Sequence, residues 1–191
     1  MSDIKTLKTH IRKTALSSRD NLTDVERVKF SKQIESFFFE LDIAPNVVSS
    51  AFLPIKTEVD LSKLIYELWS QQRSVCLPFM LDKENIEFRG YNKTTELVDN
   101  GFGTLAPSGA SEVVDPDVML VPLSAFDETG GRIGYGAGFY DRAIAKLLDN
   151  DKTPLLIGVA FACQQVDRVP CEDHDIPLDM ILTENGLIIA D

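Results

Sequence analysis

Side chains that assemble metal clusters are scarce in this sequence. It contains two histidines, His10 and His174, and three cysteines, Cys76, Cys163 and Cys171. Two histidines are too few for a histidine-based metal cluster, and no two cysteines form a C-x-x-C pair, so the common zinc-site patterns are excluded. The odd number of cysteines indicates reduced thiols, which are typical of cytosolic proteins. We therefore expect a cytoplasmic protein.

Long apolar runs and a surplus of positive charge are missing as well. No hydrophobic run approaches the roughly 20 residues needed to span a membrane, and the first residues are polar, so we expect neither a membrane segment nor a secretory signal. The formal net charge is −11. Such an acidic chain would repel the phosphate backbone of a nucleic acid. We expect small-molecule partners, no nucleic acid, no membrane, and a monomeric chain.

Glycine, in contrast, is concentrated in one short segment. Five of the eleven glycines lie within residues 130–138. The apolar segment 118–122 before them has the composition of a buried strand, and Ile144, Leu147 and Leu148 after them recur at helical spacing. Strand, glycine-rich loop and helix together can cradle phosphate. Glycines let the backbone approach the oxyanions, and the helix N-terminus offers unpaired N–H groups.

The glycine spacing differs from the best-known phosphate signatures. Gly134, Gly136 and Gly138 form G-x-G-x-G, whereas the dinucleotide fingerprint is G-x-G-x-x-G, and the sequence has no Gly-Lys-Ser/Thr step of a Walker loop. A mobile turn between strand and helix is therefore an alternative interpretation. The flanking charges favour phosphate, because Arg132 suits phosphate oxygens and Asp141 suits a magnesium ion or its waters.

Apolar periodicity along the chain predicts alternating helices and strands. We expect helices over 3–19, from a capping box at Thr23 and Glu26 to about residue 40, from Asp60 onward, and after the glycines to Leu148. Strands are expected over 47–53, 73–78, 86–90, 117–122, 154–161, 180–183 and 186–190, with mostly loop over 99–116. Several strands are continuous apolar runs, which favours a parallel sheet covered on both faces. We predict an α/β fold of three layers, a mostly parallel sheet with helices on both faces, as a single domain over residues 1–191.

The expected first helix carries a row of positive charge that is unusual in so acidic a chain. Lys5, Lys8, Arg12 and Arg19 fall near one stripe, with no acidic residue among them. A solvated helix face would explain this pattern equally well. Because a spacing of four places Lys8 and Arg12 on one face, we predict that both reach over the glycine-rich loop.

Two acidic positions follow expected strand ends. Glu58 could hold a polar ligand group or a cation, or it could merely place charge at the start of a helix, where the helix dipole favours it. His174 and Asp175 lie in the acidic segment 171–179, which reads either as an exposed solvated loop or as the source of a second carboxylate for magnesium. The local sequence leaves both alternatives open.

Taken in order, these motifs resemble the signature of the 5-formyltetrahydrofolate cyclo-ligase family, also called methenyltetrahydrofolate synthetases. The match comprises Val121-Pro122, Ala125-Phe126-Asp127, Gly130, Arg132-Ile133-Gly134-Tyr135-Gly136 and Gly138-Phe139-Tyr140-Asp141-Arg142. It extends over most of the chain, through Lys8–Arg12, Arg19, Phe52-Leu53-Pro54, Glu58-Val59-Asp60, Gly158–Phe161, Val169-Pro170 and His174-Asp175. The departures are Ala106 at a position that is often acidic, Ala137 at a frequent glycine, and Phe79-Met80 at positions that are often basic.

The resemblance implies an ATP-dependent enzyme that converts 5-formyltetrahydrofolate to 5,10-methenyltetrahydrofolate, releasing ADP and phosphate through a phosphorylated formyl intermediate. It implies Mg²⁺ as cofactor and ATP as co-substrate. By correspondence, Arg132, Lys8 and Arg12 are the expected catalytic residues, and Asp141 and Asp175 are the expected metal ligands. The expected ATP-binding residues are Lys8, Thr9, His10, Ile11, Arg12, Arg132, Ile133, Gly134, Tyr135, Gly136, Ala137, Gly138, Phe139 and Tyr140. The expected substrate-binding residues are Phe52, Glu58, Phe102 and Tyr140.

Two other functions remain open at this point. One is a sugar-phosphate or acyl-CoA enzyme on a similar scaffold, and the other is a non-catalytic folate- or nucleotide-binding module. A turnover assay distinguishes them, because only the cyclo-ligase reaction yields a chromophoric methenyl product with ATP.

Overall fold

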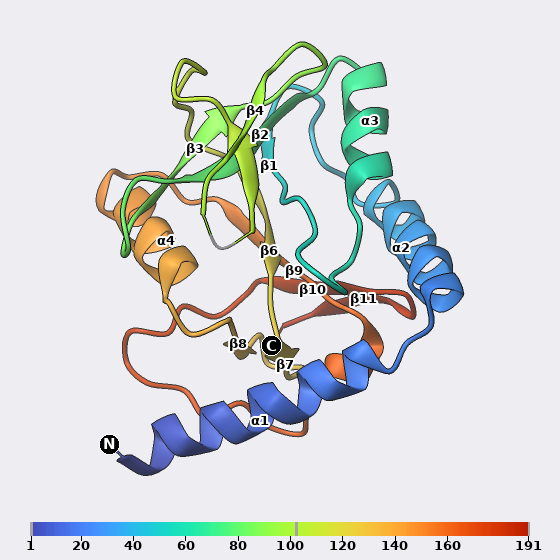
Figure 1. Cartoon of the computed structure of the whole chain (residues 1–191), viewed down its shortest axis with the longest axis vertical. Helices are drawn as coiled ribbons and strands as arrows, with labels where there is room; N and C mark the ends of the chain where they lie inside the picture. Colours follow the sequence, from blue (N-terminus) through green and yellow to red (C-terminus); the bar gives the residue numbers. More distant parts are fainter. Residues whose placement is uncertain (1, 102, 191) are drawn as a thin grey trace.

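The computed structural model describes residues 2–101 and 103–190, which form one seven-stranded sheet with helices around it (Figure 1). The strands lie in the order β11-β10-β9-β6-β1-β2-β3. The five central strands run parallel, and the two edge strands, β3 and β11, are antiparallel to their neighbours. Their bounds are β1 Val48–Ser50, β2 Ser74–Met80, β3 Ile86–Gly90, β6 Val118–Pro122, β9 Leu155–Val159, β10 Met180–Thr183 and β11 Gly186–Ile189. The predicted mostly parallel sheet is confirmed.

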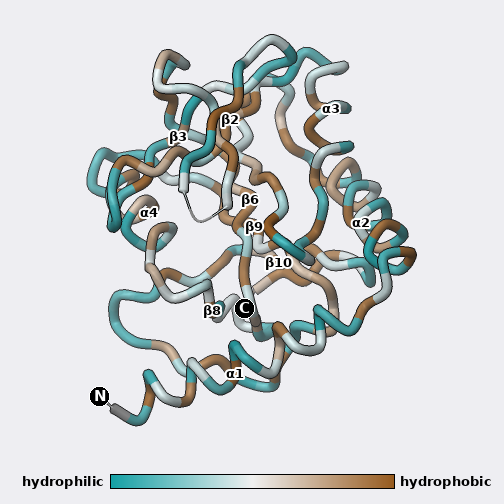
Figure 2. Tube along the Cα trace, viewed as in Figure 1, coloured by the Kyte–Doolittle hydropathy of each residue, from teal (hydrophilic) through white to brown (hydrophobic). Residues whose placement is uncertain are grey.

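Helices cover both faces of this sheet and complete three layers. The α-helices of the described residues are α1 Ser2–Asp20, α2 Asp24–Phe38, α3 Ser62–Ser70 and α4 Phe139–Asp149. On one face, Ile34 of α2 and Leu64 of α3 are buried in one apolar cluster with Leu120 of β6. On the other face, Ile144 of α4 is buried in a second cluster with Met119 of β6. Burial on both sides explains why β6 is a continuous hydrophobic run (Figure 2).

Helix α1 lies across the end of the sheet at which β6 leads into β7 and β8 (Figure 1). Its residues Ile11 and Ala15 pack against Ala125, Ile133 and Val169 in a small third cluster. This end carries the carboxyl termini of the parallel strands. The chain proceeds outward from β1 through β2 and β3, and outward on the other side from β6 through β9, so the strand order reverses between β1 and β6. Ligands of open α/β sheets bind outside the strand ends at such a reversal.

The sequence pattern did not predict two short hairpins. β4 Leu97–Asp99 pairs with β5 Leu105–Pro107, and β7 Ala125–Phe126 pairs with β8 Arg132–Ile133. The region 99–116, predicted to be mostly loop, therefore contains β5. Ala106 is completely buried in β5, so the position that is often acidic in the family lies inside the protein here. Phe102, a predicted substrate-binding residue, lies outside the described residues.

The helix ends agree with the sequence at one predicted cap and differ at the other. At α2, the Thr23 hydroxyl accepts the Glu26 N–H and the Glu26 side chain accepts the Thr23 N–H, which confirms the capping box. The helix expected from Asp60 begins at Ser62 instead, and Leu61 occupies the N-cap position. Asp60 still accepts the Ser62 N–H at 2.9 Å through Oδ1. None of the helices in the described ranges combines the length and the hydropathy that a membrane crossing requires.

Candidate active site

The glycine-rich segment divides into two parts with different roles. Gly130 and Gly131 belong to the turn between β7 and β8. Gly130 has φ of +81°, and a Cβ there would lie 2.3 Å from the Leu178 carbonyl oxygen. A Cβ on Gly131 would lie 2.9 Å from the Asp127 carboxylate. Close packing in the turn therefore requires these two glycines, although the sequence had placed them in the phosphate loop.

The second part, Gly134–Gly138, is the loop that leads into α4. Residues 134–137 are exposed, and Gly136 and Gly138 have positive φ angles of +105° and +69°. Gly138 is the N-cap residue of α4, and no side chain caps this helix end. The first N–H groups of α4 therefore have no side-chain acceptor, as a phosphate-binding helix N-terminus requires.

Helix α1 delivers Arg12 onto this loop. The Arg12 Nε donates to the Gly134 carbonyl oxygen at 2.7 Å, and its guanidinium lies beside Gly136. Ile11 and Ile133 pack in the small cluster beneath, which fixes α1 against β8. Thr9 and His10, also predicted to bind ATP, are exposed on α1. The predicted approach of α1 to the glycine loop is therefore observed for Arg12.

Lys8 points elsewhere. Its Nζ donates to Asp175 Oδ2 at 2.5 Å and to Glu172 Oε2 at 2.9 Å, and the lysine side chain is 14% exposed. Burial alone would lower the pKa of Lys8, but the two carboxylates raise it overall, so the amino group stays charged. The structure thus places Lys8 on the acidic segment, one turn of α1 away from the glycine-loop contact of Arg12.

The buried Arg132 and the partly exposed Asp141 form an ion pair at the start of α4. The Arg132 Nη2 donates to Asp141 Oδ1 at 2.6 Å, and its Nη1 donates to the Ile176 carbonyl oxygen. The Ile176 N–H in turn donates to Asp141 Oδ1 at 3.4 Å. Burial lowers the pKa of Arg132, an effect that the Asp141 charge opposes. The pair ties the first turn of α4 to the segment that carries Asp175.

The two predicted metal ligands, Asp141 and Asp175, therefore lie on neighbouring segments, and each already pairs with a cation. Within residues 2–101 and 103–190, no group of three or more His, Cys, Asp or Glu side chains is arranged to hold a metal ion. Carboxylate oxygens nevertheless suit Mg²⁺, which often takes only one or two protein carboxylates and completes its shell with water and substrate phosphate. The residues present fit a magnesium ion that arrives with a nucleotide, rather than a resident metal cage.

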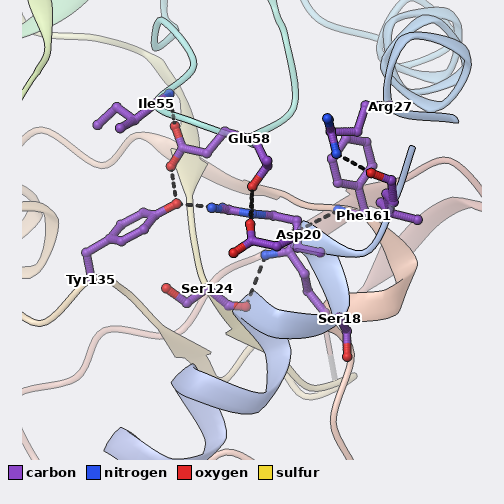
Figure 3. A network of polar contacts seen from close by, with 12 residues as sticks. Ser18, Asp20, Arg27, Ile55, Glu58, Ser124, Tyr135 and Phe161 are labelled. Atoms are coloured by element: carbon purple, nitrogen blue, oxygen red, sulfur yellow. Dashed lines mark hydrogen bonds and ion pairs between the residues drawn. The ribbon is translucent and has the colours of Figure 1, made fainter. Parts of the chain in front are cut away.

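The buried Glu58 belongs to a polar network with Tyr135 and Arg19 (Figure 3). Its Oε2 accepts the Ile55 N–H at 2.7 Å, and its Oε1 accepts the hydroxyl of Tyr135 from the glycine loop. The Tyr135 oxygen accepts Nη1 of Arg19 at 2.6 Å, and Arg19 Nε donates to the Thr57 hydroxyl at 3.0 Å. Burial raises the pKa of Glu58, although these donors and the Arg19 charge oppose the shift.

The alternative that Glu58 only interacts with the dipole at the start of a helix is wrong. Helix α3 starts at Ser62 and has no acidic residue in its first turn. Glu58 instead lies in the loop after β1, at the sheet edge where the strand order reverses. Its contact with Tyr135 brings the expected folate segment against the expected nucleotide loop, although the two are 77 residues apart in the sequence.

The aromatic residues predicted to meet substrate differ in their surroundings. Phe52 is 4% exposed and belongs to the core cluster of the α2–α3 face. Tyr140 packs against the α4 cluster, and its hydroxyl is buried without a hydrogen-bond partner among the described residues. Burial raises the pKa of Tyr140, so the hydroxyl keeps its proton. Phe139 lies under the Arg142 guanidinium, 5.7 Å from ring centroid to Cζ, and Ala137 accepts a 2.7 Å hydrogen bond from Arg142.

Three buried polar residues that organise the site were assigned no role from the sequence. Arg19 holds Tyr135 and Thr57, as described above. Asp127 accepts four hydrogen bonds in the β7–β8 turn and the adjoining Val169 segment. Gln164 donates to the Leu123 and Ser124 carbonyl oxygens just after β6. Asp127 begins the sequence Asp-Glu-Thr-Gly-Gly, a turn-forming composition that could have indicated its role. Gln164 has no comparable local signal.

Comparison with known proteins places this geometry in a family. The model of the 5-formyltetrahydrofolate cyclo-ligase family matches residues 4–184. A 5-formyltetrahydrofolate cyclo-ligase of Haemophilus influenzae is 32% identical over 185 residues, covering 92% of this chain and 95% of the relative. One of Escherichia coli is 36% identical over 140 residues, covering 70% and 76%. The solved 5,10-methenyltetrahydrofolate synthetase of Aquifex aeolicus superposes with a TM-score of 0.81 at 32% identity, covering 96% of this chain and 92% of that one. The chain belongs to the 5-formyltetrahydrofolate cyclo-ligase family.

Proposed function

We propose that this protein converts 5-formyltetrahydrofolate to 5,10-methenyltetrahydrofolate in an ATP-dependent ring closure that releases ADP and phosphate. Family membership supports the folate reaction. The observation that carries the proposal is the meeting of three segments at one sheet edge: Arg12 of α1 contacts the glycine loop at Gly134, and Tyr135 of that loop contacts Glu58. A nucleotide on the loop and a folate at Glu58 would therefore be neighbours.

The proposed chemistry needs no protein nucleophile. A formyl oxygen is a poor leaving group, and transfer of the γ-phosphoryl group to it makes a good one. The neighbouring folate nitrogen then attacks the activated carbon and gives up its proton, and the carbon–oxygen bond breaks as phosphate leaves. The formyl oxygen ends in the released phosphate. The protein contributes positioning and charge stabilisation, which account for most of the catalysis in phosphoryl transfer.

In this proposal the phosphates bind between α1 and the start of α4. The N–H groups of the glycine loop and of the first turn of α4 receive phosphate oxygens, and Arg12 lies close enough to neutralise them. Lys8 is charged and already holds two carboxylates, so it would exchange Glu172 for a phosphate oxygen while it keeps Asp175. Arg132 acts from beneath the loop, where it also orients Asp141.

Magnesium belongs to the same proposal. Asp141 is the first candidate ligand, because it lies in the first turn of α4, and Asp175 is the second. A bound Mg²⁺ would neutralise phosphate charge during transfer. Asp141 and Asp175 would hold it at the junction of α4 and the acidic segment. Arg132 and Lys8 would keep the two carboxylates in place.

The folate is proposed to bind at the loop after β1. Glu58 offers a buried carboxylate to a polar group of the pterin or to another donor of the folate, and the buried hydroxyl of Tyr140 offers an unfilled hydrogen-bonding position. Phe52 would support this pocket from the core beneath. A monomeric cytoplasmic enzyme remains part of the proposal.

The test is an absorbance assay for the methenyl product with purified protein, 5-formyltetrahydrofolate and magnesium, with and without ATP. The proposal expects product only when ATP is present, and ADP only when the folate is present. Equal ADP release without folate would indicate a plain ATPase. Folate binding without turnover would indicate a non-catalytic binding module.

A further inference from the structure

Tyr135 combines an exposed backbone position with an inward-pointing hydroxyl. It lies between Gly134 and Gly136 in the exposed loop, and 46% of the residue is accessible to solvent. Its hydroxyl nevertheless reaches Glu58, which is only 8% exposed (Figure 3). Burial and the nearby Glu58 raise the pKa of Tyr135, so the phenol keeps its proton and can donate it in this hydrogen bond.

The contact occupies the carboxylate on which the folate proposal depends. Glu58 Oε2 is engaged by the Ile55 N–H of its own loop at 2.7 Å. Glu58 Oε1 is engaged by Tyr135. The first contact is local and fixes the orientation of the carboxylate. The second comes from a different element, so it can be exchanged without rebuilding the loop after β1.

The neighbours of Tyr135 permit such an exchange. A Cβ on Gly134 would meet nothing within 4 Å, and neither glycine beside Tyr135 has a side chain to obstruct the ring, so the phenol can swing away while Arg12 keeps its contact with the Gly134 carbonyl oxygen. Arg19 would stay in place when the phenol leaves, because its Nε remains bonded to the Thr57 hydroxyl at 3.0 Å. Its positive charge would then continue to face Glu58.

We propose that Tyr135 is a gate on the folate site: its hydroxyl holds Glu58 Oε1 in the ligand-free protein, and 5-formyltetrahydrofolate must displace it to use that carboxylate. This inference rests on the proposed function. Displacement also removes the hydrogen bond between the glycine loop and the folate segment, so folate arrival loosens the loop around position 135 for phosphate, while Arg12 still holds Gly134. Because one ligand breaks a contact that restrains the binding loop of the other, the two binding equilibria are linked.

The first test needs no ligand. The ¹⁵N order parameters of the Gly134–Gly138 backbone amides are measured by NMR for the wild type, for Tyr135→Phe and for Tyr66→Phe. Tyr66 is a matched control, because it is also exposed but lies on α3, where its ring meets Lys93. The gate predicts that the order parameters around position 135 fall to the range of a flexible loop, below about 0.6, in Tyr135→Phe alone. Unchanged order parameters in Tyr135→Phe overturn the proposal.

The second test measures competition. Calorimetric titration with 5-formyltetrahydrofolate in the absence of nucleotide should give a Kd about tenfold lower for Tyr135→Phe than for the wild type and Tyr66→Phe. An equal or higher Kd for Tyr135→Phe overturns the gate, because it would mean that the hydroxyl is indifferent to the folate or helps to bind it. If no variant binds the folate, the proposed function fails, and the order-parameter experiment alone decides whether Tyr135 holds the loop.

Discussion

Replacing Asp127 with Asn tests how the turn beneath the glycine loop is held. Asp127 is 1% exposed. Its Oδ1 accepts the Thr129 N–H at 3.0 Å, the Thr129 hydroxyl at 2.8 Å and the Gly131 N–H at 3.0 Å, and its Oδ2 accepts the Val169 N–H at 2.7 Å. In the Asn variant the amide oxygen can keep the first three contacts. The NH₂ group then faces the Val169 N–H, donor against donor.

The expected loss of stability follows from this one pair of opposed donors. One hydrogen bond to a charged group is lost, and a buried N–H is left without a partner, which together should lower the free energy of unfolding by about 2–4 kcal/mol. With a urea m-value of about 2 kcal/mol/M, the denaturation midpoint should fall by about 1–2 M. Asp127→Ala removes all four contacts and should be worse. The exposed neighbour Glu128, replaced with Gln, is the control and should change the free energy of unfolding by less than about 0.5 kcal/mol.

The pH dependence of the Asp127→Asn destabilisation provides a second test. Burial alone would raise the pKa of Asp127, but its hydrogen bonds from Val169, Thr129 and Gly131 lower it overall. A depressed folded-state pKa contributes stability that is present above the unfolded pKa and is lost as pH falls through the folded pKa. The difference between wild type and Asp127→Asn should therefore shrink in acid. A midpoint shift below about 0.3 M at neutral pH, or one that grows in acid, would refute this reasoning.

Three further changes probe the site. Arg12→Ala should raise the KM for ATP at least about tenfold with little effect on the melting temperature, since a charge-assisted phosphate contact is worth about 1.5–3 kcal/mol. The control is Lys5→Ala at an exposed position of the same helix, which should leave that KM unchanged. Equal KM values for both variants would exclude a phosphate contact by Arg12. Asp141→Asn should raise the magnesium concentration for half-maximal activity more than it raises the KM for the folate; an unshifted magnesium titration with a lower melting temperature would instead assign Asp141 to the fold. Lys8→Met should destabilise the protein at neutral pH. Lys8 holds the pKa of Asp175 below its ordinary value despite burial, so the difference in stability should disappear as pH falls through that pKa. Thermal melts at neutral and acidic pH measure this difference, and a pH-independent difference would contradict the ion pair.

Features encoded by local sequence were predictable. The apolar run of β6 predicted a strand buried on both faces, and Thr23 with Glu26 predicted the start of α2, because periodicity and capping depend on residues within a few positions of one another. The positions of the glycine loop and of α4 follow from the same kind of signal. The two short hairpins were missed, since two- and three-residue strands have no periodicity to detect.

Features that depend on long-range packing were not predictable in the same way. The glycine pair Gly130-Gly131 looked like part of a phosphate loop, but the approach of Leu178 and Asp127 explains it. Lys8 lay on the expected helix face, yet its ion pairs with a segment more than 160 residues away draw its amino group from the loop. The contact of Tyr135 with Glu58 likewise exists only after β1, α1 and the glycine loop meet at one sheet edge.

The most direct test of the proposed reaction follows the formyl oxygen. The protein is given ATP, magnesium and 5-formyltetrahydrofolate labelled with ¹⁸O in the formyl group, while absorbance records the methenyl product and mass spectrometry records the released phosphate. The account predicts one phosphate carrying ¹⁸O for each methenyl group formed. Methenyl product accompanied by unlabelled phosphate, or phosphate release without methenyl product, would contradict it.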